Sequence, residues 1–150
     1  MISTTPRINV KRFSRFTEIE PSLSQKITAA REQYLFPVEG NKLSDYRNSD
    51  ARSIHFVAGY NNQLAGYVQY DPKLNRLRQM LVLPDFQGIG IGKNLVDEVV
   101  AEAKEHANKE LLVNAWAASQ GFYTKTGFVP YGAPYESNCI MCQKMRRLCN

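Results

Sequence analysis

A glycine-rich turn between an expected strand and an expected helix is the strongest constraint on this chain. The run Gln87-Gly88-Ile89-Gly90-Ile91-Gly92 follows the strand-like stretch 74–83 and precedes apolar residues at helical spacing. The first N–H groups of a helix have no intrahelical partner, and the helix dipole makes that end positive. Glycine also lets the backbone adopt positive φ close to a bulky anion. The turn therefore predicts a phosphate site at a helix start, with Lys93 adding a positive charge.

Two other phosphate-binding motifs do not fit this turn. The dinucleotide fingerprint needs G-x-G-x-x-G in an early parallel βαβ unit, whereas this run has G-x-G-x-G after an expected antiparallel meander. A P-loop has four residues between its first glycine and its Gly-Lys pair, and Ser or Thr follows the lysine. Here only three residues separate Gly88 from Gly92, and Asn94 follows Lys93. The remaining alternative is a tight turn that only caps a helix.

The rest of the chain predicts one domain over residues 1–150 with a mixed α/β fold, an α+β arrangement around a mixed sheet. A length of 150 residues and an apolar fraction of 43% suit one packed core. Turn compositions at 59–62 and 71–73 favour a three-stranded antiparallel meander. The stretch 39–52 is too polar to build core and predicts a loop with a short helix. The expected helices span 22–34, 91–103 and 117–124, and the expected strands span 8–13, 53–58, 63–70, 74–83, 110–114, 128–130 and 139–145.

Charge and cysteine content limit the partners. The net charge of +5 suits an anionic partner, but basic residues are scattered except for Lys144, Arg146 and Arg147, so we expect no nucleic acid. No run of 18 apolar residues and no cleavable leader occur, so we expect no membrane contact and a cytoplasmic location. No second Cys/His pair accompanies Cys139-x-x-Cys142, so we expect a strand with reduced thiols there and no metal.

Two stretches resemble the conserved motifs of one family. Residues 81–92 resemble motif A of the GNAT superfamily of acetyl-CoA-dependent N-acetyltransferases, whose defining positions match Gln87, Gly90 and Gly92. Residues 118–128 resemble motif B, with the pair Phe122-Tyr123 and a closing Gly-Phe. Both occur in the family's order and separation, and the similarity extends over about residues 50–147.

The resemblance implies the GNAT fold, a mixed sheet whose fourth and fifth central strands splay apart. It implies that Met80, Leu81, Val82 and Leu83 offer backbone groups to the pantetheine arm of acetyl-CoA, while residues 87–93 hold its pyrophosphate. The implied cofactor-binding set is Leu81, Val82, Leu83, Gln87, Gly88, Ile89, Gly90, Ile91, Gly92 and Lys93.

The resemblance also implies catalytic roles for two residues. Tyr123 would protonate the departing coenzyme A thiolate, because a phenol with a pKa near 10 is protonated at neutral pH. The backbone N–H of Leu81 would polarise the thioester carbonyl. The alternative for Tyr123 is an aromatic side chain that only packs against the cofactor.

The expected reaction is direct transfer of acetyl from acetyl-CoA to a primary amine of a small molecule. The alternatives are a protein or peptide amine, or a non-catalytic sensor of acyl-CoA. The general base stays open, because residues 76–80 contain no carboxylate; the candidates are water, Glu136, Asp71, Asp50 and His55. Many relatives dimerise, so a homodimer is compatible with the sequence.

Upstream residues resemble the ElaA-like branch of the family. The residues that carry this likeness are Arg31, Tyr34, Phe36, Asp45, Asp50 and His55. That branch typically carries a His near the last strand, where this chain has Cys142 or a neighbour, so no role of that His is transferred. Trp116 is a candidate for the acceptor pocket, with simple packing as its alternative.

Overall fold

The computed structural model of the chain describes residues 7–36 and 46–150. Part of the predicted polar loop, including Gly40, Asn41, Ser44 and Asp45, lies outside these residues. The elements in chain order are β1 (Ile8–Phe13), η1 (Phe16–Glu18), α1 (Pro21–Tyr34), α2 (Arg47–Arg52), β2 (Ile54–Tyr60), β3 (Gln63–Asp71), β4 (Arg76–Val82), η3 (Pro84–Phe86), α3 (Ile91–Glu105), β5 (Glu110–Trp116), η4 (Ala117–Ser119), α4 (Gln120–Lys125), β6 (Val129–Pro130), β7 (Tyr135–Ser137) and β8 (Ile140–Leu148).

The strands form one open mixed sheet, which confirms the predicted fold class. Its order is β1-β2-β3-β4-β5-β8-β6, with β7 paired to β8. Only the β4–β5 pair is parallel among the described strands, and every other pair is antiparallel. In the described ranges, no helix is long and apolar enough to cross a membrane.

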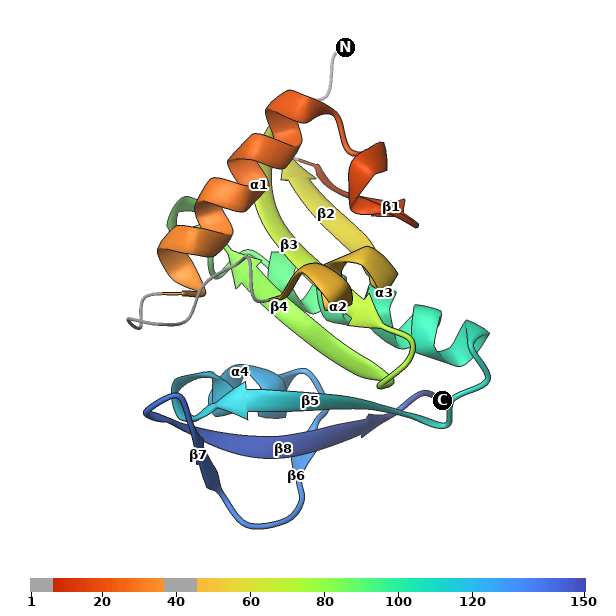
Figure 1. The fold of residues 1–150 in the computed structure, drawn as a ribbon, viewed down its shortest axis with the longest axis vertical. Coiled ribbons are helices and arrows are strands. Elements are labelled where there is room, and N and C mark those ends of the chain that lie inside the picture. The colour runs from red at the N-terminus through yellow and green to blue at the C-terminus, as the bar shows by residue number, and fades with distance from the viewer. Residues whose placement is uncertain (1–6, 37–45) are drawn as a thin grey trace.

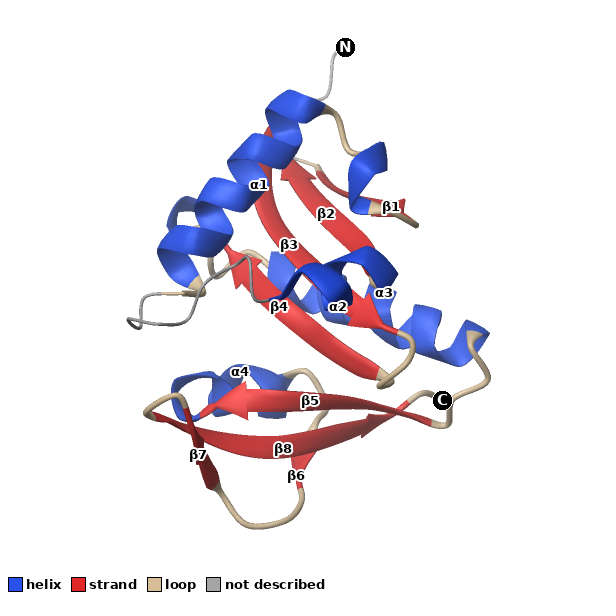
Figure 2. Ribbon diagram, viewed as in Figure 1, coloured by secondary structure: helices blue, strands red, loops and turns tan. Residues whose placement is uncertain are grey.

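Helices cover both faces of the sheet (Figure 2). Helix α1 packs on one face, where Ile27 and Ala30 join a core cluster with Val57 and Leu81. Helix α3 packs on the other face and presents the apolar stripe that the spacing predicted. The buried members of that stripe are Ile91, Leu95, Val96, Val99, Val100 and Ala103.

Strand boundaries differ from the predictions at two turns. The strand predicted from residue 74 begins at Arg76, because the Asp71 carboxylate accepts hydrogen bonds from the N–H groups of Lys73 and Leu74 and closes a turn. The strand predicted from residue 139 begins at Ile140, because Asn138 and Cys139 have φ of 50° and 64° and form a tight hairpin turn. That hairpin adds β7, which the sequence analysis missed because three residues give no readable alternation.

Strands β4 and β5 pair over only two residues before they separate. Arg76 pairs with Leu112 and Leu77 with Val113, and no further pair joins these strands. Beyond that point β5 stays paired with β8 as far as Trp116, while β4 stays paired with β3 as far as Val82. The strands therefore splay toward their carboxyl ends, as Figure 1 shows and as the resemblance implied.

The two family-like motifs meet at Gly92. A Cβ placed on Gly92 would lie 2.6 Å and 2.8 Å from ring atoms of Phe122. Real Cβ atoms do not come this close to other heavy atoms, so any larger residue here would force the Phe122 ring to shift away from the first turn of α3. The third glycine of the turn therefore serves packing between helices.

We predict that Gly92→Ala lowers the free energy of unfolding by about 1–3 kcal/mol, because the new methyl group overpacks against Phe122. The matched control is Gly121→Ala in α4, where an added Cβ meets nothing within 4 Å; it should leave stability unchanged or raise it by up to about 1 kcal/mol. Urea unfolding measures both. Adding Phe122→Leu to Gly92→Ala should recover part of the loss, and no recovery would contradict the stated contact.

Candidate active site

A cavity of about 490 Å³ occupies the splay between β4 and β5. Backbone and side chains of 76–82 form one wall and residues 113–116 form the other. Aromatic residues at its edges include Tyr34, Phe36, Tyr46, Trp116 and Tyr135, and Tyr123 also lines it. Trp116, predicted as a candidate for this pocket, therefore lies in its wall.

A bulge in β4 disturbs its pairing with β3 at the middle of the cavity wall. Tyr67 pairs with Leu81 and Gln69 pairs with Arg78, so Gln79 and Met80 have no one-to-one partner in β3. Gln79 also has φ of 58°, in the left-handed region that non-glycine residues rarely adopt. The extra residue bends β4 away from β5 and takes Met80 out of the regular ladder.

Strand alternation decides which backbone groups of β4 face the cavity. Leu83 donates its N–H to Ala65 O in β3 at 2.8 Å, so the polar groups of Val82 must point to the opposite edge. Gln87 Nε2 confirms this orientation, because it donates to Val82 O at 3.0 Å. The same alternation turns the N–H of Leu81 toward β3, where Leu81 pairs with Tyr67. Val82 therefore offers its backbone groups to the cavity edge more directly than Leu81 does.

The glycine turn has the geometry of an anion site. Gly88 and Gly90 have φ of 81° and 93°, and Gly90 is the N-cap of α3. No side chain caps this helix start, and residues 87–90 are exposed. A Cβ on either glycine would meet nothing within 4 Å, so their left-handed backbone, rather than space, requires glycine there. The exposed helix start suits a pyrophosphate.

Lys93 lies at the same helix start but is already in an ion pair. Its Nζ is 3.0 Å from Asp97 Oδ2, with side chains 70% and 43% exposed. Such exposed pairs contribute little stability, so an anion at the helix start can draw Lys93 away.

Tyr123 is buried at the cavity wall. Its ring packs edge-on against Phe122 at 5.1 Å and Phe128 at 5.4 Å between ring centroids. Burial raises the pKa of the Tyr123 phenol above its ordinary value. The hydroxyl therefore keeps its proton at neutral pH.

None of the four side chains proposed as general base lines the described part of the cavity. Asp71 is fully buried and accepts hydrogen bonds from Arg52 and Arg78, which help to hold its pKa below the ordinary value although burial opposes them. Asp50 is paired with Arg31, and Glu136 is exposed on β7.

The comparison with protein families settles the membership of the chain. A profile for the acetyltransferase (GNAT) domain matches residues 16–149. The chain belongs to the GNAT acetyltransferase family. The protein is therefore an acyltransferase, and its family uses acetyl-CoA.

Solved GNAT structures share the fold over most of the chain. Escherichia coli ElaA is 20% identical with a TM-score of 0.74, covering 94% of this chain and 99% of its own. An acyl-CoA N-acyltransferase from Pseudomonas aeruginosa is 17% identical with a TM-score of 0.73, covering 94% and 99%. A Bacillus anthracis protein assigned as a streptothricin acetyltransferase, solved with acetyl coenzyme A, is 20% identical with a TM-score of 0.59, covering 69% and 67%. No curated protein sequence matches significantly.

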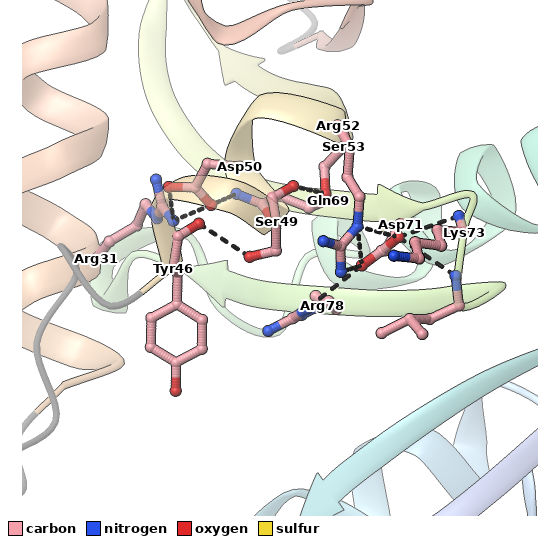
Figure 3. Close-up of polar contacts among 11 residues, drawn as sticks. Arg31, Tyr46, Ser49, Asp50, Arg52, Ser53, Gln69, Asp71, Lys73 and Arg78 are labelled. Atoms are coloured by element: carbon pink, nitrogen blue, oxygen red, sulfur yellow. Dashed lines mark hydrogen bonds and ion pairs between the residues drawn. The ribbon is translucent and has the colours of Figure 1, made fainter.

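A buried arginine supports the bulge from the α1 side. Arg31 is only 1% exposed, and its Nη2 lies 2.9 Å and 3.0 Å from the two carboxylate oxygens of Asp50 (Figure 3). Arg31 Nε donates to Gln79 Oε1 at 3.1 Å, so this GNAT protein ties its first helix to the bulged residue of β4. The guanidinium also lies 5.4 Å from the Tyr67 ring centroid.

The sequence analysis associated Arg31 and Asp50 with the ElaA-like branch but did not predict their contact. The spacing signals only the burial of Arg31, since Arg31 follows Ile27 by four residues and thus shares the apolar face of α1; it does not indicate Asp50 as the partner. Tyr34, predicted for the same face, is instead 38% exposed at the helix end.

His55 belongs to the same buried network and faces away from the cavity. Its Nε2–H donates to Asp50 O at 3.1 Å, and Tyr67 donates its hydroxyl to Nδ1 at 2.5 Å. Gln69 Nε2 in turn donates to the Tyr67 hydroxyl at 2.8 Å and to Asp50 Oδ1 at 2.8 Å. Burial lowers the pKa of His55 to about 4, so the ring is neutral at pH 7. This geometry fits a buried histidine with satisfied hydrogen bonds in the core.

We predict that Arg31→Met lowers the free energy of unfolding by about 3 kcal/mol, because Asp50 and Gln79 lose a charged partner in a largely buried site. The control is Lys26→Gln, which removes the same charge from an exposed position on α1 and should stay within about 0.5 kcal/mol. Urea unfolding measures both. Equal losses in the two variants would contradict a structural role for the Arg31 contacts.

We predict that stability falls as the pH drops from 7 to 4.5. The unfolded chain takes up a proton at His55 near pH 6.5, whereas the folded ring resists protonation down to a pKa of about 4. The stabilisation that neutral His55 gives the folded state is fully present above pH 6.5. Between pH 6.5 and pH 4.5 the free energy of unfolding falls by about 2–3 kcal/mol. Chemical denaturation across this range should show the slope, which His55→Gln removes and His106→Gln keeps. A slope unchanged in His55→Gln would contradict the assignment.

Proposed function

We propose that this GNAT protein transfers acetyl from acetyl-CoA to a primary amine of a small molecule. The observation that supports the proposal is the cavity in the splay, because the part of β4 beyond its pairing with β5 and the residue Tyr123 both line it. Its volume of about 490 Å³ falls within the range of small-molecule sites.

The residues around the splay fit acetyl-CoA. The helix start at Gly88–Gly90 offers uncapped N–H groups to the pyrophosphate, and Lys93 can add its charge. At the β4 edge, the N–H of Val82 and the second lone pair of its oxygen, which also accepts from Gln87 Nε2, offer hydrogen bonds to the amides of the pantetheine arm. The unpaired Met80 lies deeper in the cleft, toward the closed end of the splay.

A main-chain N–H of β4 at the bulge polarises the thioester carbonyl in this proposal. Leu81 was the residue first predicted for this donor, and the strand alternation favours its neighbour Met80, which is out of the ladder. A backbone donor at a bulge is held rigidly by the sheet on either side, so little reorganisation is needed as charge develops on the oxygen.

Tyr123 acts as the general acid. The neutral amine nitrogen forms a bond to the acetyl carbon, the carbon–sulfur bond breaks, and the thiolate takes the proton of the Tyr123 hydroxyl. The acylated nitrogen releases one N–H proton to solvent, and solvent returns a proton to the Tyr123 phenolate. A phenol is a weaker acid than a thiol, so the proton moves together with bond cleavage rather than before it. Burial disfavours the charged thiolate and equally the phenolate that replaces it, as the raised Tyr123 pKa shows, so burial alone does not drive the transfer.

The incoming ammonium loses its proton to water in this proposal. The described lining of the cavity contains no Asp or Glu side chain that could accept the proton directly. It does contain Arg76 and Arg78, and a nearby positive charge lowers the pKa of an ammonium group. The fraction of free amine in the site is raised in this way without a dedicated base.

A non-catalytic sensor of acyl-CoA is the competing function, because it would use the same glycine turn and β4 edge. Thermal shift with acetyl-CoA and thiol release across a panel of primary amines separate the two. We expect stabilisation by acetyl-CoA together with amine-dependent thiol release. Stabilisation without release on any amine assigns the sensor role, and no stabilisation contradicts both.

We predict that Tyr123→Phe lowers kcat by about 10²-fold or more, with acetyl-CoA affinity nearly unchanged, because only the proton donor is removed. Tyr131→Phe is the control, since Tyr131 does not line the cavity. Steady-state kinetics and acetyl-CoA titration of both variants provide the measurement. An unchanged kcat in Tyr123→Phe would leave Tyr123 as a packing residue.

A further inference from the structure

Two arginines extend from β4 on the face of the sheet that α3 does not cover. Leu77 packs in the core cluster that includes the buried stripe of α3. Side chains alternate between faces along a strand, so Arg76 and Arg78 point to the other face. Contacts of Arg78 agree, because its guanidinium lies 5.5 Å from the ring centroid of Tyr46, and both residues lie along the β4 edge that borders the cavity (Figure 3).

The two arginines differ in whether a carboxylate neutralises their charge. Arg78 Nη1 lies 3.3 Å from Asp71 Oδ2, so a buried carboxylate partly balances it. Arg76 forms no ion pair with any described residue, and its Nε is buried without a hydrogen-bond partner among them. A buried guanidinium donor without an acceptor is unfavourable unless a ligand supplies one.

Arg76 also acts across the splay on β7. Burial raises the pKa of Tyr135, and the positive charge of Arg76 works against that rise. Tyr135 and Arg76 both line the cavity. The uncompensated charge therefore lies inside the pocket and not on the outer surface of the sheet.

The phosphates of acetyl-CoA do not explain this charge. Arg76 begins β4, and at ~3.3 Å per residue it lies roughly 20 Å from Val82, beyond which the glycine turn follows. The turn leads into α3, which packs on the opposite face from Arg76. The anion that meets Arg76 must come from the other substrate.

From these observations we infer that the acceptor is an amine that carries a carboxylate, such as an α-amino acid, with Arg76 and Arg78 as the residues that select the carboxylate. The inference rests on the proposed transfer function and names its substrate class. The planar guanidinium fork matches a carboxylate in two parallel hydrogen bonds. Aromatic residues at the cavity edge, including Phe36, Tyr46 and Trp116, suit an apolar or aromatic side chain on that acceptor.

The test compares phenylalanine, phenylalaninamide and phenethylamine as acceptors, with thiol release from acetyl-CoA as the readout. The carboxylate raises the pKa of its own amine, so intrinsic reactivity at pH 7 favours the amide. We expect kcat/KM for the acid to exceed that for the amide by about tenfold or more, a preference that only binding can produce. Equal or lower kcat/KM for the acid in the unmodified protein overturns the inference.

Variants then test whether Arg76 is responsible for the preference for the carboxylate. Arg76→Gln should reduce the acid-to-amide ratio by about tenfold through KM, and Arg76→Lys should retain part of it. Lys11→Gln removes an exposed positive charge on β1 and should leave the ratio unchanged. If the acid-to-amide ratio of kcat/KM falls equally in Lys11→Gln and Arg76→Gln, the preference depends on the net charge of the protein, and the assignment to Arg76 is overturned.

A binding measurement keeps this inference separate from the transfer reaction. Thermal shift is recorded with N-acetylphenylalanine and with N-acetylphenylalaninamide, without acetyl-CoA. Stabilisation by N-acetylphenylalanine but not by the amide supports the carboxylate site, whatever the thiol-release result. Absence of thiol release with every amine would contradict only the proposed function. Equal stabilisation by both compounds, or by neither, overturns the carboxylate site.

Discussion

The short contact between β4 and β5 is the constraint on which the rest of this structure depends. Two pairs, Arg76 with Leu112 and Leu77 with Val113, join a four-stranded half of the sheet to a half built around β5 and β8. A parallel pair needs a long crossover, and α3 supplies it while packing on one face of the sheet. Because pairing stops so early, the backbone edges of both strands remain available to a ligand.

The bulge at Gln79 and Met80 is held from the α1 side. A left-handed residue in the middle of a strand is unfavourable, so surrounding contacts must hold it. Arg31 provides one such contact to Gln79 and a second to Asp50, whose main-chain oxygen also meets His55. The network therefore connects the first helix to the strand that faces the thioester in the proposed reaction.

The two faces of β4 carry different chemistry. On the α3 side Leu77 packs into the apolar core, which supports the packing of the glycine turn and α4. On the other side Arg76 and Arg78 bring positive charge to a cavity whose described lining has no carboxylate. Strand alternation alone produces this division, so one strand can serve the acetyl donor through its backbone edge and the acceptor through its side chains.

Local sequence patterns determined much of this protein. The turn residues that delimit β2 and β3, the apolar stripe of α3 and the glycine turn before it are set by neighbours in the chain, so each could be predicted. Tertiary structure alone decided three other features: the bulge at Gln79, the Arg31–Asp50 contact and the unpaired charge of Arg76. Each depends on which side chain lies opposite another across a sheet or between a helix and a strand. That register is fixed when the whole core packs, and no run of consecutive residues encodes it.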